Sequence, residues 1–176
     1  MNKLVPVITG LMVAVLVGSV LSPAAAASLP ITDKKGDATN GNPDFDIRRA
    51  GITDTGKLRM VVQGEAGGTR PSGADQADLV YAYVFVTDVG IVAVTSHRAE
   101  DSGQVGNDLA WHSHRVTLDS NNCVSSIQDF GKARLNDHSV YVGNTGATSI
   151  DAVLTAELTI DGGVCVTAVW DSAPEA

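Results

Sequence analysis

The sequence predicts an all-β protein, a single antiparallel β-sandwich of about ten strands with an immunoglobulin-like or jelly-roll-like arrangement. Short apolar or alternating runs recur along the chain, and clusters of Gly, Asn and Asp separate them. No segment of ten residues shows the 3.6-residue apolar period of a helix. A closed barrel is the alternative architecture, because it is built from the same kind of strand.

Residues 1–27 have the pattern of a secretory signal peptide. A charged start is followed by an apolar run from Leu4 to Leu21 and by an alanine cluster that ends at Ala27. The alternative is an uncleaved membrane anchor, since the run is just long enough to cross a bilayer. We expect cleavage after Ala26 or Ala27, which leaves a secreted, extracytoplasmic domain of residues 28–176 that is not embedded in a membrane.

The mature chain of about 149 residues is long enough for one domain with a real core. Without Lys3 the formal net charge of -8 becomes -9. An acidic surface repels nucleic acid and anionic membranes and attracts cations. We therefore expect no nucleic-acid partner, and instead a metal ion, a small ligand or a glycan. The sequence leaves the oligomeric state open.

The first segment of the mature chain with candidate ligands is the polar loop at residues 33–46. It offers the carboxylates of Asp33, Asp37, Asp44 and Asp46. Oxygen-rich loops of this kind bind Ca²⁺, although the spacing is not that of an EF-hand. The alternative is a plain turn-rich loop, because the same residue types form turns through hydrogen bonds to the backbone.

The strands that follow are predicted at residues 47–53 and 57–63, with a turn between them. The glycine-rich loop 64–78 lacks a Gly-Lys-Ser/Thr sequence, so a phosphate-binding loop is not expected there. Residues 79–87 form an apolar run on both faces, which predicts a central strand. A tight turn at 88–90 then predicts a hairpin partner at residues 91–97.

The next strand, predicted at residues 109–119, carries a His-x-His pattern. Side chains two residues apart in a strand share a face, so His112 and His114 point the same way. His97 ends the preceding strand, and antiparallel pairing would bring it beside them. Three imidazoles at one place predict a site for Cu or Zn. The alternative is that these histidines are structural and bond loop carbonyl groups.

The sequence does not determine which further ligands this ion would have. Water could complete the coordination, as could one of the side chains of His138, Asp101 or Asp108. Because protons compete for imidazole nitrogens, metal binding should weaken as the pH falls below about 6.5, the value of a free imidazole.

Five more strands are predicted in the C-terminal part, and the last residues are expected to be a frayed tail. The strands are residues 123–128, 132–135, 139–142, 152–160 and 164–170. Cys123 and Cys165 are the two cysteines of the chain. Outside the cytoplasm such a pair most simply forms one disulfide, and two thiolate metal ligands are the alternative.

Aromatic side chains offer a possible platform for a sugar. Tyr81, Tyr83 and Trp111 are the candidates, and packing in the core is the alternative role for them. Serine catalysis is not expected. Ser113 lies between two histidines but points to the opposite face of the strand, and the chain has no Gly-x-Ser-x-Gly sequence.

The N-terminal part resembles a known class of secreted sandwich domains. The pattern Asp33-x-x-Gly36-Asp37, followed by Asn42-Pro43-Asp44-x-Asp46-Ile47 and a strand that ends near Gly64, is similar to the DOMON and family 9 carbohydrate-binding domains. The resemblance covers about a quarter of the mature chain. It implies an immunoglobulin-like fold that binds sugars or haem, in some members with calcium. The chain departs from the haem pattern, because Met60, its only mature methionine, is not placed to be an axial ligand.

These observations together predict a secreted, non-enzymatic binding protein with a histidine-based transition-metal site. The alternative is a carbohydrate-binding or cell-surface adhesion module in which the histidines are structural. A third hypothesis is a metal-dependent oxidase or hydrolase that uses the same three histidines.

Overall fold

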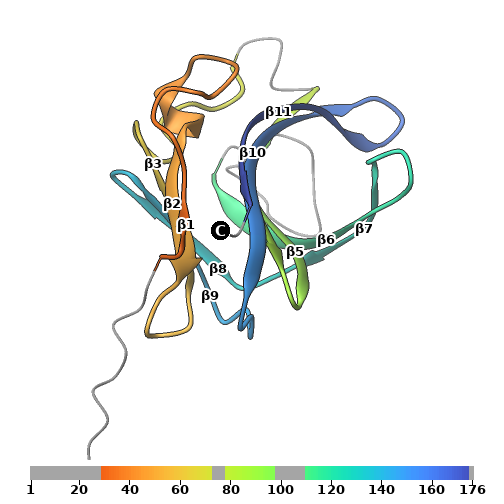
Figure 1. Ribbon diagram of the computed structural model, residues 1–176. Helices are drawn as coiled ribbons and strands as arrows, with labels where there is room; N and C mark the ends of the chain where they lie inside the picture. The colour runs from red at the N-terminus through yellow and green to blue at the C-terminus, as the bar shows by residue number, and fades with distance from the viewer. Residues whose placement is uncertain (1–28, 73–77, 98–109, 175–176) are drawn as a thin grey trace, which may run out of the picture.

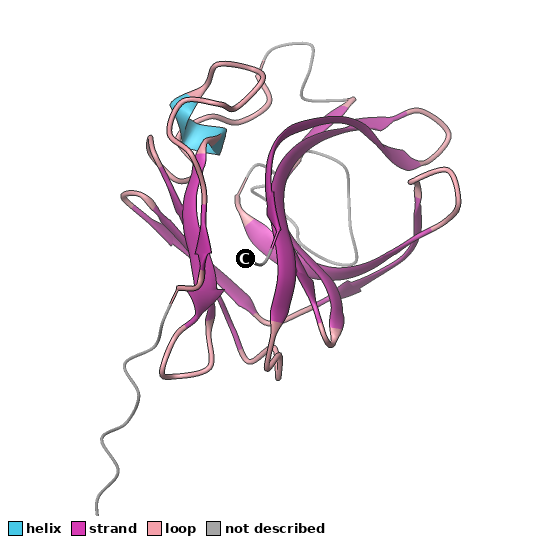
Figure 2. Cartoon of the chain, in the orientation of Figure 1, coloured by secondary structure: helices cyan, strands magenta, loops and turns pink. Residues whose placement is uncertain are grey.

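The computed structural model describes residues 29–72, 78–97 and 110–174 (Figure 1). They form two antiparallel sheets and one short 3₁₀ helix, η1 (Pro43–Phe45), which is the single cyan turn in Figure 2. The predicted all-β sandwich is confirmed, and neither sheet closes into a barrel in these ranges. The same ranges contain no helix of the length and apolarity that a membrane span requires. The predicted signal peptide, residues 1–27, lies outside the described residues.

The smaller sheet has five strands in the order β1-β2-β3-β9-β8. Along its central strand buried and half-buried residues alternate, so that one face of the sheet turns towards the core. The strands are β1 (Ile31–Thr32), β2 (Ile47–Ile52), β3 (Leu58–Val62), β8 (Lys132–Asn136) and β9 (Ser139–Gly143).

The larger sheet has six strands in the order β11-β10-β4-β5-β6-β7. The strand that is apolar on both faces, β4, lies between β10 and β5, as the sequence predicts for a central strand. The strands are β4 (Leu79–Thr87), β5 (Gly90–Ser96), β6 (His112–Leu118), β7 (Val124–Asp129), β10 (Ile150–Ile160) and β11 (Val164–Pro174).

The sequence prediction was wrong at both ends of the domain. It missed β1, because a strand of two residues is too short to show an alternating pattern. It also ended the last strand at residue 170 and expected a frayed tail, whereas β11 continues to Pro174 and pairs with Ala152 there. This extension is anchored to the other sheet, because the carboxylate of Asp171 accepts a hydrogen bond from the backbone N–H of Ile47.

Aromatic rings fill much of the space between the two sheets. The ring of Phe45 lies 4.4 Å from that of Trp170 and 5.6 Å from that of Tyr83, centroid to centroid. Phe85 and Met60 are fully buried in the same cluster. Large rings bury the most apolar area per residue, which lets a small domain form a stable core.

The six-stranded sheet curls until its two edge strands meet (Figure 1). Shifts in the pairing of β10 with β11 mark bulges, which increase local twist and bend. At the meeting point Cys123 and Cys165 form the predicted disulfide, and the backbone N–H of Val166 donates to the carbonyl oxygen of Asn122 over 3.0 Å. The sheet therefore has a convex face on the inter-sheet core and a concave face turned away from it.

Candidate metal centre

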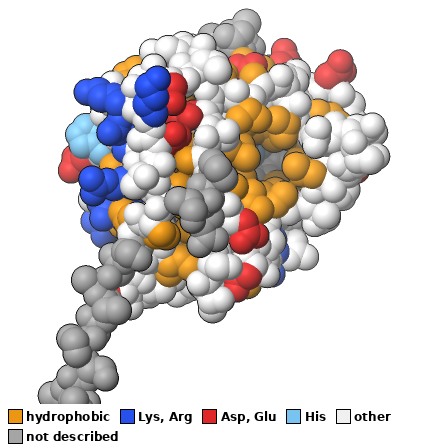
Figure 3. All heavy atoms as spheres, in the orientation of Figure 1, with side chains coloured by type: hydrophobic (Ala, Val, Ile, Leu, Met, Phe, Trp, Pro, Cys, Tyr) orange, Lys and Arg blue, Asp and Glu red, His pale blue; other side chains and the backbone are white. Residues whose placement is uncertain are grey.

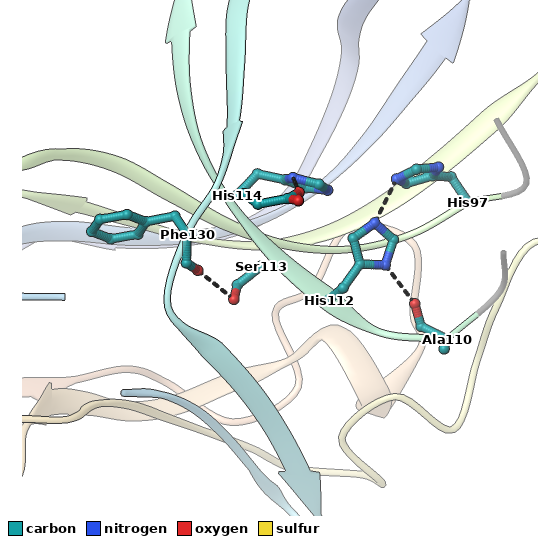
Figure 4. Close-up of polar contacts among 7 residues, drawn as sticks. His97, Ala110, His112, Ser113, His114 and Phe130 are labelled. Carbon is teal, nitrogen blue, oxygen red and sulfur yellow. Dashed lines mark hydrogen bonds and ion pairs between the residues drawn. The ribbon is translucent and has the colours of Figure 1, made fainter. Parts of the chain in front are cut away.

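The strand β6 presents two imidazoles on the concave face of the curled sheet. His112 and His114 alternate with residues that point to the inter-sheet core, as the spacing predicts. One of those, Ser113, donates its hydroxyl hydrogen bond to the carbonyl oxygen of Phe130 over 2.6 Å. The serine is therefore turned away from both imidazoles, in agreement with the sequence argument against a serine nucleophile (Figure 4).

The neighbouring strand β5 brings the third imidazole to the same place. Thr95 of β5 pairs with His112 of β6, so His97, two residues further on, projects from the same face beside it. The Nε2 atoms of His97 and His112 lie 3.0 Å apart, and the rings of His112 and His114 lie 4.6 Å apart at their centroids (Figure 4). One ligand atom from each of the three residues lies within 4.8 Å of the other two, so the cluster can hold a metal ion.

The position of the protons follows from the partner of His112. Its Nδ1 atom lies 2.7 Å from the carbonyl oxygen of Ala110, which can only accept, so Nδ1 carries the hydrogen. In the neutral ring Nε2 then has the free lone pair and accepts the hydrogen bond from Nε2–H of His97. We therefore assign His112 the tautomer that presents Nε2 as a ligand atom.

A carboxylate supports the third ring from the next strand. Asp129 of β7 pairs with His114 across the ladder, and its Oδ1 atom lies 3.5 Å from Nδ1 of His114. The imidazole is buried, with 1% of the side chain exposed, whereas the carboxylate is 59% exposed. A carboxylate at one imidazole nitrogen orients the ring and raises the basicity of the other nitrogen, which is the usual outer partner of a metal-bound histidine.

The other residues considered as ligands do not join this cluster in the described structure. His138 lies between β8 and β9 in the other sheet, where it is exposed and its Nδ1 atom bonds the carbonyl oxygen of Gly64. The suggestion that His138 completes the site is therefore wrong. Asp101 and Asp108 lie outside the described residues.

The predicted calcium loop is divided between several local roles. Asp33 and Asp37 lie together with Asp171, which comes from β11, and their carboxylate oxygens are within 4.8 Å of one another.

The other two carboxylates of the loop make local hydrogen bonds. Asp44 accepts from the backbone N–H of Glu65 and from the hydroxyl of Thr69. Asp46 accepts from the backbone N–H of Gly36. Calcium binding here stays a prediction. Sequence reasoning missed Asp171, because only the folded chain brings the last strand beside the first loop.

Asp171 is the carboxylate in this group with a clearly shifted pKa. Burial raises the pKa of Asp171 to about 6, and repulsion from Asp33 and Asp37 adds to the rise. Hydrogen bonds from the backbone of Ile47 and Ser172 act in the opposite direction, because they stabilise the charged form.

The proposed aromatic platform is mostly core. Tyr83 is fully buried, and its hydroxyl donates to the carbonyl oxygen of Asp44 and accepts from the backbone of Gly67. Its ring cannot stack on a sugar, so this part of the prediction is corrected. Trp111 and Tyr81 are half-buried and pack against the same core. Sugar binding through Tyr81 and Trp111 stays a prediction.

The acidic net charge is not spread evenly over the surface. On the outer side of the five-stranded sheet a shallow pocket is lined by four basic side chains, together with Tyr141, Thr53 and other polar residues. The basic residues are Lys57, Arg59, Lys132 and Arg134. The absence of a nucleic-acid partner, predicted from net charge, stays a prediction.

A scan against protein-family models finds no match for this chain, and neither do searches of curated proteins and of solved structures. The functional argument therefore depends on the geometry of the site.

Proposed function

We propose that this protein binds one transition-metal ion, Cu²⁺ or Zn²⁺, through His97, His112 and His114, and that it acts as a non-enzymatic metal-binding protein. Copper and zinc fit the donor set, because imidazole nitrogen is a preferred ligand of both ions. Calcium and magnesium do not fit, since they take oxygen ligands.

The observation that carries this proposal is the convergence of three imidazoles from two adjacent strands. Tetrahedral zinc with Zn–N bonds of 2.0–2.1 Å separates its ligand nitrogens by about 3.3 Å. The 3.0 Å between the Nε2 atoms of His97 and His112 is close to this value. Since all three ligand atoms lie within 4.8 Å of one another, small side-chain rotations are enough to close the site.

Outer contacts favour a ligand role over a purely structural one. His112 uses Nδ1 on the carbonyl oxygen of Ala110, and His114 has Asp129 beside its Nδ1. In both rings the other nitrogen is then directed to the cluster. In the metal-bound form the ring proton of His97 would move from Nε2 to Nδ1, which frees Nε2 as a ligand atom. The affinity should fall as the pH falls, because protons compete with the metal for the imidazole nitrogens.

A secreted location is part of the proposal. The disulfide between Cys123 and Cys165 fits an oxidising compartment, where such bonds form and persist. The predicted signal peptide would deliver the chain there.

The test is the metal content of the mature protein, purified without a histidine tag and measured by mass spectrometry. We expect near-stoichiometric copper or zinc in the wild type and its loss in the His112→Ala/His114→Ala double variant. His138→Ala is the matched control, because His138 lies in the other sheet and should not affect the metal. Circular dichroism of each variant shows whether the fold is retained.

Absence of copper and zinc from the wild type, even after incubation with either ion, would overturn the proposal. Equal loss of metal in His138→Ala and in the double variant would overturn it as well. His112→Ala alone, at a half-buried position, provides a milder variant if the double variant does not fold.

A metal-dependent hydrolase or oxidase is the second candidate function. One observation favours it, because His97 and His114 also line a cavity, and three protein ligands leave one position of a tetrahedral ion for water or substrate. The zinc-loaded protein would then hydrolyse an activated ester such as 4-nitrophenyl acetate, and the copper-loaded protein would oxidise a simple reductant. Rates equal to those of the double variant would exclude both activities on these substrates.

A further inference from the structure

The concave face of the six-stranded sheet encloses a cavity of about 500 Å³. In Figure 3 it is seen as a hollow surrounded by hydrophobic side chains. Residues from β4, β10 and β11 form one wall, and residues from β5, β6 and β7 form the other. The Cys123–Cys165 disulfide joins the two edges of the sheet and so keeps this curved wall closed on one side.

The wall of the cavity is aliphatic. At its centre Val84 stands between Leu154 and Ala93 on the neighbouring strands. The described lining residues include no Phe, Tyr or Trp, so an aromatic ligand would find no ring to stack on. Branched aliphatic side chains of this kind fit a hydrocarbon chain, which needs burial and no directional contact.

Polar groups gather at one part of this wall, where Thr95, His97 and His114 line the cavity. The hydroxyl of Thr95 is buried, with 6% of the residue exposed, and it has no hydrogen-bond partner within the described residues. A buried hydroxyl normally has a partner, because without one the hydrogen bonds that it made to water are lost and not replaced. This hydroxyl is thus the candidate partner for a polar group of a bound molecule, which a rotation of the Thr95 side chain would have to expose to the cavity.

The remaining surface does not favour a second copy of the chain as the occupant. Ile127 and Val169 are the large hydrophobic residues that are exposed in the described structure, at 50% and 46%. Both line this same cavity. The described residues thus contain no other exposed large hydrophobic side chain that a second copy could insert into the cavity.

The volume sets the size of the ligand. An apolar cavity of about 150 Å³ holds benzene, so about 500 Å³ holds a molecule of up to roughly 20 non-hydrogen atoms. A saturated chain of twelve carbon atoms with a carboxyl group stays within that limit. Burial of each CH₂ group should tighten binding by about fourfold.

We propose that this cavity binds one unbranched aliphatic carboxylic acid, with its chain along the valine-rich wall and its carboxyl group at the hydroxyl of Thr95. The ligand class is a medium-chain fatty acid or a molecule with the same acyl chain and head group. This site adjoins the proposed metal centre, because His97 and His114 line the same cavity. It does not rest on the metal function, since neither the aliphatic wall nor the Thr95 hydroxyl needs an ion.

The test is calorimetric titration of the mature protein with octanoate, decanoate and dodecanoate below their micelle concentrations. A chelator in the buffer removes metal ions, so that failure of the metal proposal does not affect the result. We expect the dissociation constant to fall by up to fourfold for each added CH₂ group. The Thr95→Val variant keeps the shape of the side chain and should weaken dodecanoate binding about tenfold, since it removes a hydrogen bond to a charged group.

Two matched controls separate the site from general effects. Thr117→Val makes the same chemical change at an exposed position of β6 and should bind dodecanoate as the wild type does. Val84→Phe fills the cavity and should abolish binding, whereas Val61→Phe, on the outer face of β3, should not.

Several results would overturn the proposal. These are the absence of dodecanoate binding, an affinity that does not depend on chain length, and equal affinities of Thr95→Val and Thr117→Val. A concentration-dependent dimer that Val84→Phe dissociates would also overturn it, because the occupant would then be a second copy of the chain.

Discussion

Asp171 and Ile47 join the two sheets through a hydrogen bond of 2.6 Å from the backbone N–H of Ile47 to the carboxylate Oδ2 of Asp171. The bond fixes the last strand to β2, but it keeps a buried carboxylate close to Asp33 and Asp37. The pKa of Asp171 is raised to about 6 in the folded protein, chiefly by burial, from an ordinary value of 3.8.

Protonation of Asp171 should therefore stabilise the fold. Between pH 3.8 and about 6 the folded protein binds more protons at this group than the unfolded chain, so its contribution to stability rises as the pH falls through that window. At pH 7 the Asp171→Asn variant should be more stable by about 1 kcal/mol, because the amide removes the buried charge and its oxygen still accepts from Ile47. The gain is limited because the NH₂ group of the amide cannot accept the second hydrogen bond, from Ser172. Urea denaturation at pH 7 and pH 4 measures this. A variant that is less stable than the wild type at pH 7 would contradict the prediction.

Calcium binding by the acidic group at the start of the domain predicts a second effect on stability. If Ca²⁺ binds at Asp33, Asp37 and Asp171, millimolar CaCl₂ should raise the melting temperature at pH 7, because a ligand of the folded state stabilises it. The increase should be lost in Asp37→Asn and retained in Asp54→Asn, which changes an exposed turn. Equal melting temperatures of the wild type with CaCl₂ and with EDTA would exclude this site.

The disulfide should contribute strongly to stability. It closes a loop with a sequence separation of 42 residues, for which the chain-entropy model gives about 4 kcal/mol. The Cys123→Ser/Cys165→Ser variant should therefore lose about 4 kcal/mol in free energy of unfolding, measured in urea. It should also bind dodecanoate more weakly, since the edges of the curled sheet are no longer joined. A loss below 1 kcal/mol would show that the unfolded chain gains little freedom when the bond is absent.

Asp129 should tune the metal site without being a ligand. Its Oδ1 atom lies 3.5 Å from Nδ1 of His114, the position of an outer partner. Asp129→Asn should weaken zinc binding about tenfold, at the lower end of the usual range because the carboxylate is exposed. Asp151→Asn, an exposed carboxylate of β10, is the control. Competition with a chromophoric chelator measures both, and equal affinities would remove Asp129 from the site.

The sequence predicted the histidine cluster because it depends on short-range rules. Alternation along β6 places His112 and His114 on one face, and the tight turn after Thr87 makes β4 and β5 a hairpin. The pairing of β5 with β6 was the one assumption needed to add His97, and the structure confirms it.

The remaining features depend on long-range geometry that no local pattern contains. Asp171 joins Asp33 and Asp37 only because β11 returns to the first loop of the domain. The cavity and the proposed role of Thr95 depend on the curl of the six-stranded sheet, in which bulges interrupt the pairing of β10 with β11. The prediction that Tyr83 belongs to a sugar-binding platform was wrong, because the sequence shows that its strand has an apolar face but does not show that the second sheet covers this face.

The pairing of Thr95 with His112 has a consequence for how the site can be altered. If β6 slipped by one residue against β5, His112 and His114 would turn into the inter-sheet core, and Trp111 and Ser113 would face the cavity. A single inserted residue within β6 would thus separate the three imidazoles of the proposed ion site while every histidine remained in the chain. Three histidines alone are therefore not a sufficient signature for such a metal site in another protein. The two histidines on one strand must also be separated by an even number of positions, so that both point to the same face.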